Sequence, residues 1–77
     1  MSRGPFIQDF GKRVRELREA ARLSQEDLAF EAGLHRTAIS HIEQATRSST
    51  LETVEKLARA LNVQPSELIP KIKRAKK

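Results

Sequence analysis

Four polar side chains lie close together in the sequence and can act on one helical face: Arg36, Thr37, Ser40 and His41. Residues about one turn apart on an α-helix point the same way, so this spacing predicts a single exposed row. An arginine can fork onto O6 and N7 of guanine, and a threonine can touch the methyl group of thymine or hydrogen-bond a base or phosphate. Ser40 is short and should contribute less. For His41 the sequence leaves two roles open, a hydrogen bond to a base or phosphate and plain solvation.

The stretch LSQEDLAFEAGLHRTAISHIE, residues 23–43, predicts the corner that would present this row. It contains two short helical patterns, one after Ser24 and one over residues 36–44, broken at Gly33. Two helices that cross at about 90–120° through a tight turn need a small side chain where they approach and a glycine in the turn. Ala29 and Gly33 meet these needs, and five apolar positions close the corner into a core. Those positions are Leu28, Ala32, Leu34, Ile39 and Ile42.

The flanking segments predict the other helices of an all-α fold, because two further apolar stripes recur at helical spacing. The stripes consist of Phe6, Phe10, Val14, Leu17 and Ala21, and of Leu51, Val54, Leu57, Ala58 and Leu61. Ser24 and Asp27 have the spacing of a capping box, which would begin the second helix. Pro65 suits the first position of a short fifth helix, and Pro70 should interrupt or bend the chain after it. We therefore expect a compact five-helix bundle that contains a helix-turn-helix.

The basic charge of the chain lies mostly at its C-terminal end. The tail KIKRAKK, residues 71–77, holds five of the fifteen basic side chains, so residues 1–70 carry ten basic and ten acidic side chains and sum to zero. We expect a flexible N-terminal arm over residues 1–5, one folded domain over residues 6–70, and a basic tail that adds non-specific attraction to nucleic acid. Any DNA-binding face of the domain must therefore come from where its charges lie rather than from its net charge.

Several functional classes are disfavoured by composition. The chain has no cysteine, which fits a reducing cytoplasm and removes thiolate metal sites and disulfides. No stretch approaches the roughly 20 apolar residues of a membrane span, and MSRGPF lacks the apolar core of a signal peptide. Two histidines six residues apart make no metal site without further ligands, and no glycine-rich phosphate loop is present. We expect a cytoplasmic protein that is not an enzyme and binds no cofactor or metal.

The chain resembles the phage repressor and Cro type of helix-turn-helix regulators, the XRE-like family, over residues 10–69. The most telling stretches are LSQEDLA, GLHRTAISHIE and STLETVEKLARALNV. The pattern HRT.IS.IE, followed four residues later by Arg47, also resembles the small controller proteins of restriction–modification systems. The resemblance implies a lambda-repressor-like fold and a transcriptional regulator that reads a two-fold operator in double-stranded DNA through the major groove.

The resemblance also implies roles for individual residues. Arg36 and Thr37 match the leading base-contacting positions of the family, and Ser40 and His41 match the next turn. The side chains matched or suggested as phosphate contacts are Gln25, His35 and Arg47. For Gln25 the free amides at a helix N-terminus support that role, and an ordinary exposed residue is the alternative. For His35 a backbone-facing role and an ordinary turn residue stay open as well. Arg18 and Glu43 match an internal ion pair that ties the first helix to the recognition helix; two separate surface charges are the alternative.

A homodimer is the expected assembly, with Leu68, Ile69 and Ile72 as candidate interface residues because they are apolar and lie outside the predicted core. The alternative function is that of an antitoxin or adaptor whose main role is to bind a protein, such as a toxin or an RNA polymerase subunit. Phe30 would belong to that surface if exposed, although we expect it to pack against neighbouring side-chain stems.

Two features depart from the family pattern. Ala45 stands where many relatives carry a glycine after the recognition helix, and no proline precedes the fourth helix. These departures leave the conformation of the loop, and so the reach of Arg47, open.

Overall fold

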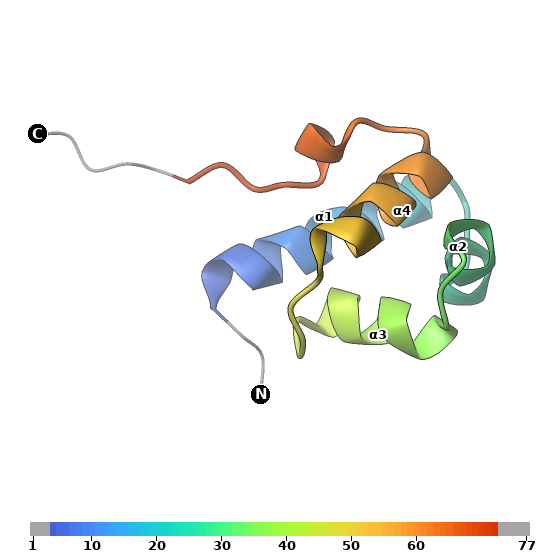
Figure 1. Ribbon diagram of the computed structural model, residues 1–77, viewed down its shortest axis with the longest axis horizontal. Coiled ribbons are helices and arrows are strands. Elements are labelled where there is room, and N and C mark those ends of the chain that lie inside the picture. The colour runs from blue at the N-terminus through green and yellow to red at the C-terminus, as the bar shows by residue number, and fades with distance from the viewer. Residues whose placement is uncertain (1–3, 73–77) are drawn as a thin grey trace, which may run out of the picture.

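The computed structural model describes residues 4–72, which form four α-helices and one short 3-10 helix (Figure 1). The elements are α1 (Pro5–Ala20), α2 (Gln25–Ala32), α3 (Arg36–Gln44), α4 (Leu51–Leu61) and η1 (Pro65–Glu67). The predicted all-α class and the helix-turn-helix are confirmed. Most of the expected N-terminal arm and most of the basic tail lie outside the described residues. None of the helices in the described part of the chain is both long and apolar enough to cross a membrane.

Local side-chain hydrogen bonds mark where α2 and α4 begin. The Ser24 hydroxyl accepts from the Asp27 amide at 2.9 Å, and the Asp27 carboxylate accepts from the Ser24 amide at 3.0 Å. This is the predicted capping box, and these interactions with Ser24 hold the pKa of Asp27 below its usual value. Thr50 caps α4 in the same way, since its hydroxyl accepts from the Thr53 amide at 3.1 Å. Both caps satisfy amides that a helix N-terminus leaves free.

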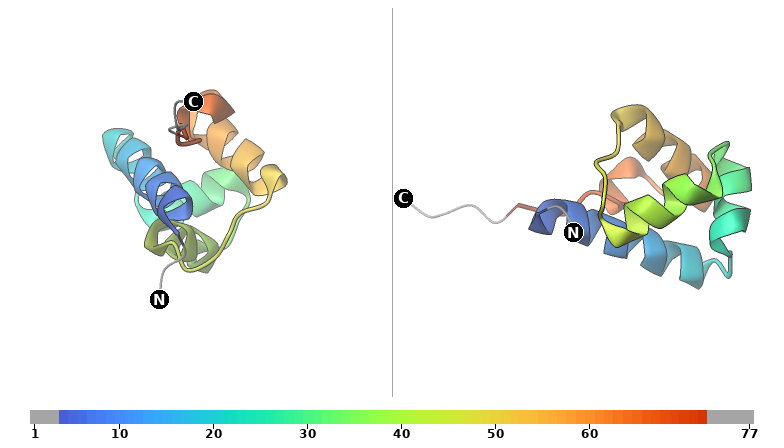
Figure 2. Two further views of the ribbon diagram at one scale, coloured as in Figure 1. Left: turned by 90° about the vertical axis from the view of Figure 1, so that its left-hand side faces the viewer. Right: turned by 90° about the horizontal axis from the view of Figure 1, so that it is seen from below.

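The helices place α3 on the outside of the molecule. In Figure 1, α3 runs along one side, beneath α1 and α4, while α2 closes one end. Figure 2, seen from below, shows α3 in front of the other helices. One face of α3 packs mainly against α1 and α2, so its opposite face is left to solvent.

The core joins all four α-helices and the segment after η1. Its most deeply buried side chains are Val14 from α1, Leu28 from α2, Ile39 from α3, Leu57 from α4 and Leu68. The remaining buried apolar residues are Phe10, Ala29, Ala32, Ile42, Ala45, Val54, Ala58 and Leu61. The predicted inward positions of the corner are all here except Leu34, which is half-buried against this cluster. A single core therefore fixes α3 relative to its neighbours.

Two expectations about the C-terminal segment are wrong. The fifth helix is only the three-residue 3-10 turn η1, because Pro70 follows shortly after it and cannot continue a helix. Leu68, a candidate for the dimer interface, is instead fully buried and packs into the core of its own subunit. It is therefore not available to a partner. Ile69 and Ile72 remain 38% and 73% exposed.

Some predicted core residues lie outside the core. Phe6 is 39% exposed and Leu51 is 85% exposed, because each lies in the first turn of its helix, beyond the reach of the core. Ala21 is exposed at the residue that caps α1. Phe30 does not pack against neighbouring stems as expected, since it is 83% exposed on the outer side of α2. The molecule thus presents more apolar surface than its sequence pattern predicts.

Candidate nucleic-acid interface

The turn between α2 and α3 has the geometry that its glycine predicts. Gly33 adopts the left-handed conformation, with φ 70° and ψ 35°, which a residue without Cβ reaches at no steric cost. The Leu34 amide then donates to the Ala29 carbonyl at 2.8 Å, which closes the C-terminal end of α2. His35 follows in an extended conformation as the residue before α3, and its side chain makes no capping hydrogen bond. The chain therefore leaves one helix and enters the next within three residues.

The predicted polar row lies on the outer face of α3. Arg36 and Thr37 are exposed, and Ser40 and His41 are partly exposed. Ile39, between the two pairs, is fully buried. Among residues 4–72 neither Arg36 nor Thr37 has a hydrogen bond or ion pair from its side chain. The guanidinium of Arg36 therefore keeps all its donors for an external acceptor.

The other end of α3 is held by a partly buried polar cluster, which we call the Glu43 clamp and define as Arg18, Glu43 and Gln25. The Arg18 guanidinium donates to the Glu43 carboxylate through Nε at 2.7 Å and through Nη2 at 3.1 Å. The Arg18 and Glu43 side chains are only 11% and 5% exposed. The hydrogen bond with Glu43 raises the pKa of Arg18 above its usual value. The ion pair implied by the family resemblance is thus formed between α1 and α3.

The clamp has two further contacts that the sequence did not reveal. Arg18 Nη1 donates to the Leu23 carbonyl oxygen at 2.7 Å, and Gln25 Nε2 donates to Glu43 Oε1 at 3.1 Å. Gln25 is the first residue of α2, so Glu43 connects α3 to both preceding helices. One amide hydrogen of Gln25 is used in this bond, which leaves the other available to an external acceptor.

The loop between α3 and α4 presents a second polar group beside the row. Ala45 ends α3 in the left-handed conformation, with φ 59°, so alanine adopts here the geometry that the missing glycine would provide. The following loop turns Arg47 to the surface beside a hollow of about 150 Å³, which His41, Ser49 and Thr53 also line. The Ser49 hydroxyl is buried and has no hydrogen-bond partner within the described part of the chain. The burial of the Ser49 hydroxyl depends on how the loop folds against its neighbours, so the sequence could not predict it.

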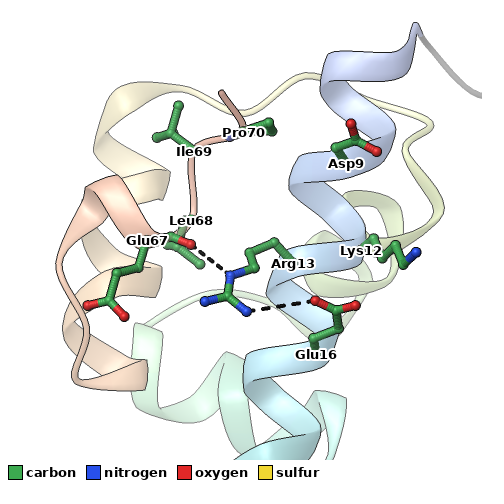
Figure 3. A pocket seen from close by; sticks show the side chains of 8 residues that line it. All are labelled: Asp9, Lys12, Arg13, Glu16, Glu67, Leu68, Ile69 and Pro70. Carbon is green, nitrogen blue, oxygen red and sulfur yellow. Dashed lines mark hydrogen bonds and ion pairs between the residues drawn. The ribbon is translucent and has the colours of Figure 1, made fainter. Parts of the chain in front are cut away.

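A separate set of polar contacts lies between α1 and the C-terminal segment (Figure 3). Arg13 Nε donates to the Glu67 carbonyl oxygen at 2.9 Å, and Arg13 Nη1 lies 3.7 Å from Glu16 Oε1. These groups line a hollow of about 330 Å³ together with Leu68, Ile69 and Pro70. Arg13 therefore holds the end of η1 against α1 and so helps to position Ile69, which follows two residues later. No group of three or more metal-ligating side chains forms within residues 4–72.

Comparisons with known proteins agree with this architecture. A family profile described as Helix-turn-helix matches residues 14–68. The control protein C.BamHI of Bacillus amyloliquefaciens is 51% identical over 61 residues, which span 78% of this chain and 75% of that protein. The restriction–modification controller protein C.AhdI from Aeromonas hydrophila superposes with a TM-score of 0.80 at 46% identity, covering 82% of this chain and 96% of the other.

A further solved structure is that of the controller protein C.Esp1396I, a tetramer in complex with its natural 35 base-pair operator. It matches with a TM-score of 0.80 at 27% identity, over 86% of this chain and 87% of the other. The chain therefore belongs to the helix-turn-helix family and, within it, to the restriction–modification control proteins.

Proposed function

We propose that this protein is a sequence-specific transcriptional regulator that binds operator DNA through α3. The observation that carries the proposal is the unpartnered row at Arg36 and Thr37, which lies on a helix whose far end is immobilised by the Glu43 clamp. A rigidly held helix with free donors is what base reading requires, because hydrogen bonds to base edges depend on geometry. A cytoplasmic location and the absence of a catalytic role belong to the same proposal.

Base reading follows from the order of side chains along α3. Arg36 begins the helix, where it can reach deepest into a major groove, and its guanidinium matches the paired acceptors of guanine. Thr37 lies beside it and offers a methyl group and a hydroxyl. Ser40 and His41 stand one turn further along and are less exposed. Arg36 and Thr37 therefore make the main base contacts, and Ser40 and His41 make lesser ones.

Phosphate contacts would flank this row on both sides. Gln25 lies at the N-terminus of α2 with an amide hydrogen to spare, and His35 stands before the first turn of α3. Arg47 lies beyond the other end, next to the unsatisfied Ser49 hydroxyl and the N-terminus of α4. A phosphate oxygen there would accept hydrogen bonds from Arg47 and would favour the positive end of the helix dipole of α4.

The active unit of this proposal is a homodimer. An apolar surface, which we call the end patch, consists of Phe6, Leu51 and Ile69, and Ile72, three residues after Ile69 and 73% exposed, is a further candidate contact. Phe6, Leu51 and Ile69 also line one hollow of about 150 Å³. If both copies contact each other through this same patch, the contact is two-fold and relates the two α3 helices by that axis. Half-sites would then lie about one helical turn apart, roughly 34–36 Å.

Selection of bound sites from a random duplex pool tests the proposal. The expected result is enrichment of one sequence with two-fold symmetry, whose half-sites each contain a guanine that Arg36 can contact. Recovery of unselected sequence after repeated rounds at moderate salt would contradict sequence-specific binding. The salt concentration must be fixed, since phosphate contacts alone bind every sequence at low ionic strength.

Sedimentation of two matched variants tests the end patch. Leu51→Glu and Phe30→Glu place the same charge at positions that are 85% and 83% exposed, so neither should disturb the core. We expect Leu51→Glu to yield monomers at micromolar concentration while Phe30→Glu behaves as the wild type. Equal behaviour of the two variants would remove the end patch from the proposal.

A protein-binding role is a second candidate, and the exposed aromatic ring of Phe30 favours it. Antitoxins and adaptors use such apolar groups to hold a toxin or a polymerase subunit, and a large exposed aromatic is a typical anchor at protein interfaces. The neighbouring gene discriminates between the roles. A gene for an endonuclease or methyltransferase supports the controller role, and a gene for a small toxin supports the alternative.

A further inference from the structure

Gly11 lies in the interior of α1, where it is buried against the last turn of α3. A Cβ at this position would overlap the Ile42 carbonyl oxygen and lie 3.2 Å from the Glu43 carbonyl oxygen. Both obstacles are backbone atoms, which cannot rotate away as the end of a flexible side chain can. The two helices are therefore in contact through their backbones at this point.

The other two glycines of the chain show that this contact is specific to Gly11. A Cβ at Gly4 or Gly33 would meet no atom within 4 Å, and Gly33 is required by its positive φ instead. Glycine weakens the interior of a helix, because it leaves the backbone more freedom to lose on folding. At Gly11 the closeness of α1 and α3 provides the compensating reason for glycine.

Gly11 and Arg18 lie two helical turns apart on α1, and both act on the same end of α3. Arg18 holds Glu43 through its side chain, while Gly11 admits the backbone of Ile42 and Glu43. A long ion-paired side chain tolerates a shift of the helix, whereas a backbone-to-backbone contact does not. The separation of the two helices is therefore determined at Gly11.

We infer that Gly11 is a positioning residue for base recognition: it determines how closely α3 lies on α1 and so how Arg36 and Thr37 are aimed. The inference rests on the proposed function. A methyl group at residue 11 would push the C-terminal end of α3 outward by a distance on the order of 1 Å. The opposite end is held by the turn at Gly33, so the displacement tilts α3 about that corner: it shifts Ser40 and His41 the most and changes the direction in which Arg36 and Thr37 point at the bases.

The test compares two glycine-to-alanine variants in the full chain. Gly11→Ala and Gly4→Ala are titrated against the duplex selected by the wild type and against a shuffled duplex of the same composition. The readout is selectivity, the ratio of the two dissociation constants. We expect Gly11→Ala to lower selectivity by about tenfold or more, as the loss of one good base contact does, with little change on shuffled DNA. Gly4→Ala should match the wild type.

Stability is controlled with Leu61→Ala, a core truncation at the far end of α4. At a temperature where both variants are fully folded, Leu61→Ala should keep the selectivity of the wild type. If Gly11→Ala acted only by lowering stability, it too would keep that selectivity. Full selectivity of folded Gly11→Ala would overturn the inference while leaving the proposed function intact. Failure of Gly11→Ala to fold would also overturn it, because Gly11 would then serve stability rather than aim. A wild type without selectivity would instead refute the proposed function.

Discussion

Each end of α3 carries a charged side chain, but the two side chains differ in what they contact. At its C-terminal end the Glu43 carboxylate is buried and accepts hydrogen bonds from two side chains on two other helices. At its N-terminal end the Arg36 guanidinium is exposed, with no partner among the described residues. One end is satisfied by the protein itself, and the other is left to be satisfied from outside.

This difference separates the residues that hold α3 in place from the residues proposed to contact DNA bases. A buried ion pair contributes little net stability, since its attraction is offset by the loss of hydration, but removing one partner is costly. An exposed unpartnered cation contributes nothing to the fold and is free to bind. Variants at the two ends should therefore change different quantities, folding at one and recognition at the other.

The largest effect should come from Glu43→Ala, which leaves the partly buried Arg18 guanidinium with only the Leu23 carbonyl and the more distant Glu19 as partners. We expect the free energy of unfolding to fall by up to about 3 kcal/mol, the lower end of the cost of breaking a buried pair, measured by urea titration. Glu55→Ala is the matched control, because Glu55 pairs with Arg59 at 3.0 Å on the surface, where such a pair contributes about 0.3–0.5 kcal/mol. Equal losses in the two variants would mean that the clamp holds nothing.

Arg36→Ala should show the reverse behaviour at the other end of α3. We expect an affinity loss of about 1–3 kcal/mol for the selected duplex, a relaxed preference at one base pair, and stability within about 0.5 kcal/mol of the wild type. Fluorescence anisotropy on selected and shuffled duplexes, beside a thermal melt, measures all three. If both duplexes are weakened equally, Arg36 contacts phosphate and not a base.

Replacing Ala45, the residue that ends α3, by glycine should change the stability less, because the relief of backbone strain is offset by other losses. Ala45 and Arg22 both have positive φ, 59° and 61°, which costs a residue with Cβ about 1–2 kcal/mol. Arg22 is exposed, so Arg22→Gly should stabilise the protein by about 1 kcal/mol. Ala45 is buried, so Ala45→Gly also loses up to about 0.8 kcal/mol of burial, and glycine costs about 0.4–1 kcal/mol more through its freer unfolded chain, so this variant should be near neutral. A large gain for Ala45→Gly would show that the loop is strained.

The capping box of α2 gives a modest pH dependence near the clamp. Because folding lowers the pKa of Asp27, its contribution to stability is full above its unfolded pKa of about 3.9 and is lost as the pH falls below that value. Asp27→Asn should flatten this part of the acid-unfolding curve, while its effect on selected-site affinity at neutral pH stays small. An unchanged acid limb would show that the capping box does not titrate with folding.

The sequence predicted the parts of this structure that depend on periodicity and on local chemistry. Helical spacing and the cap at Ser24 locate the corner, and they place Arg36 outside and Ile39 inside. The pairing of Arg18 with Glu43 was implied only by the family resemblance, because a separation of 25 residues carries no geometric information.

The features that the sequence could not predict depend on distances between elements. Gln25 meets Glu43 only because α2 and α3 fold back on each other, and Gly11 gains its role only from the approach of Ile42. Leu51 fits an apolar stripe as well as Leu57 does, yet periodicity gives the face of a residue and not its depth, so Leu51 lies outside the core. Leu68 shows the opposite error. It belongs to neither apolar stripe and was predicted to lie at a dimer interface, yet it is fully buried in the core.

Methylation interference on the selected duplex tests base reading by α3 most directly. Methylating guanine N7 blocks the acceptor that Arg36 would use in the major groove, whereas methylating adenine N3 alters only the minor groove. The wild type should be excluded by N7 methylation at one guanine in each half-site, and Arg36→Ala should lose that sensitivity while keeping the rest of the pattern. Interference confined to adenine N3, or an identical pattern for both proteins, would contradict base recognition by Arg36.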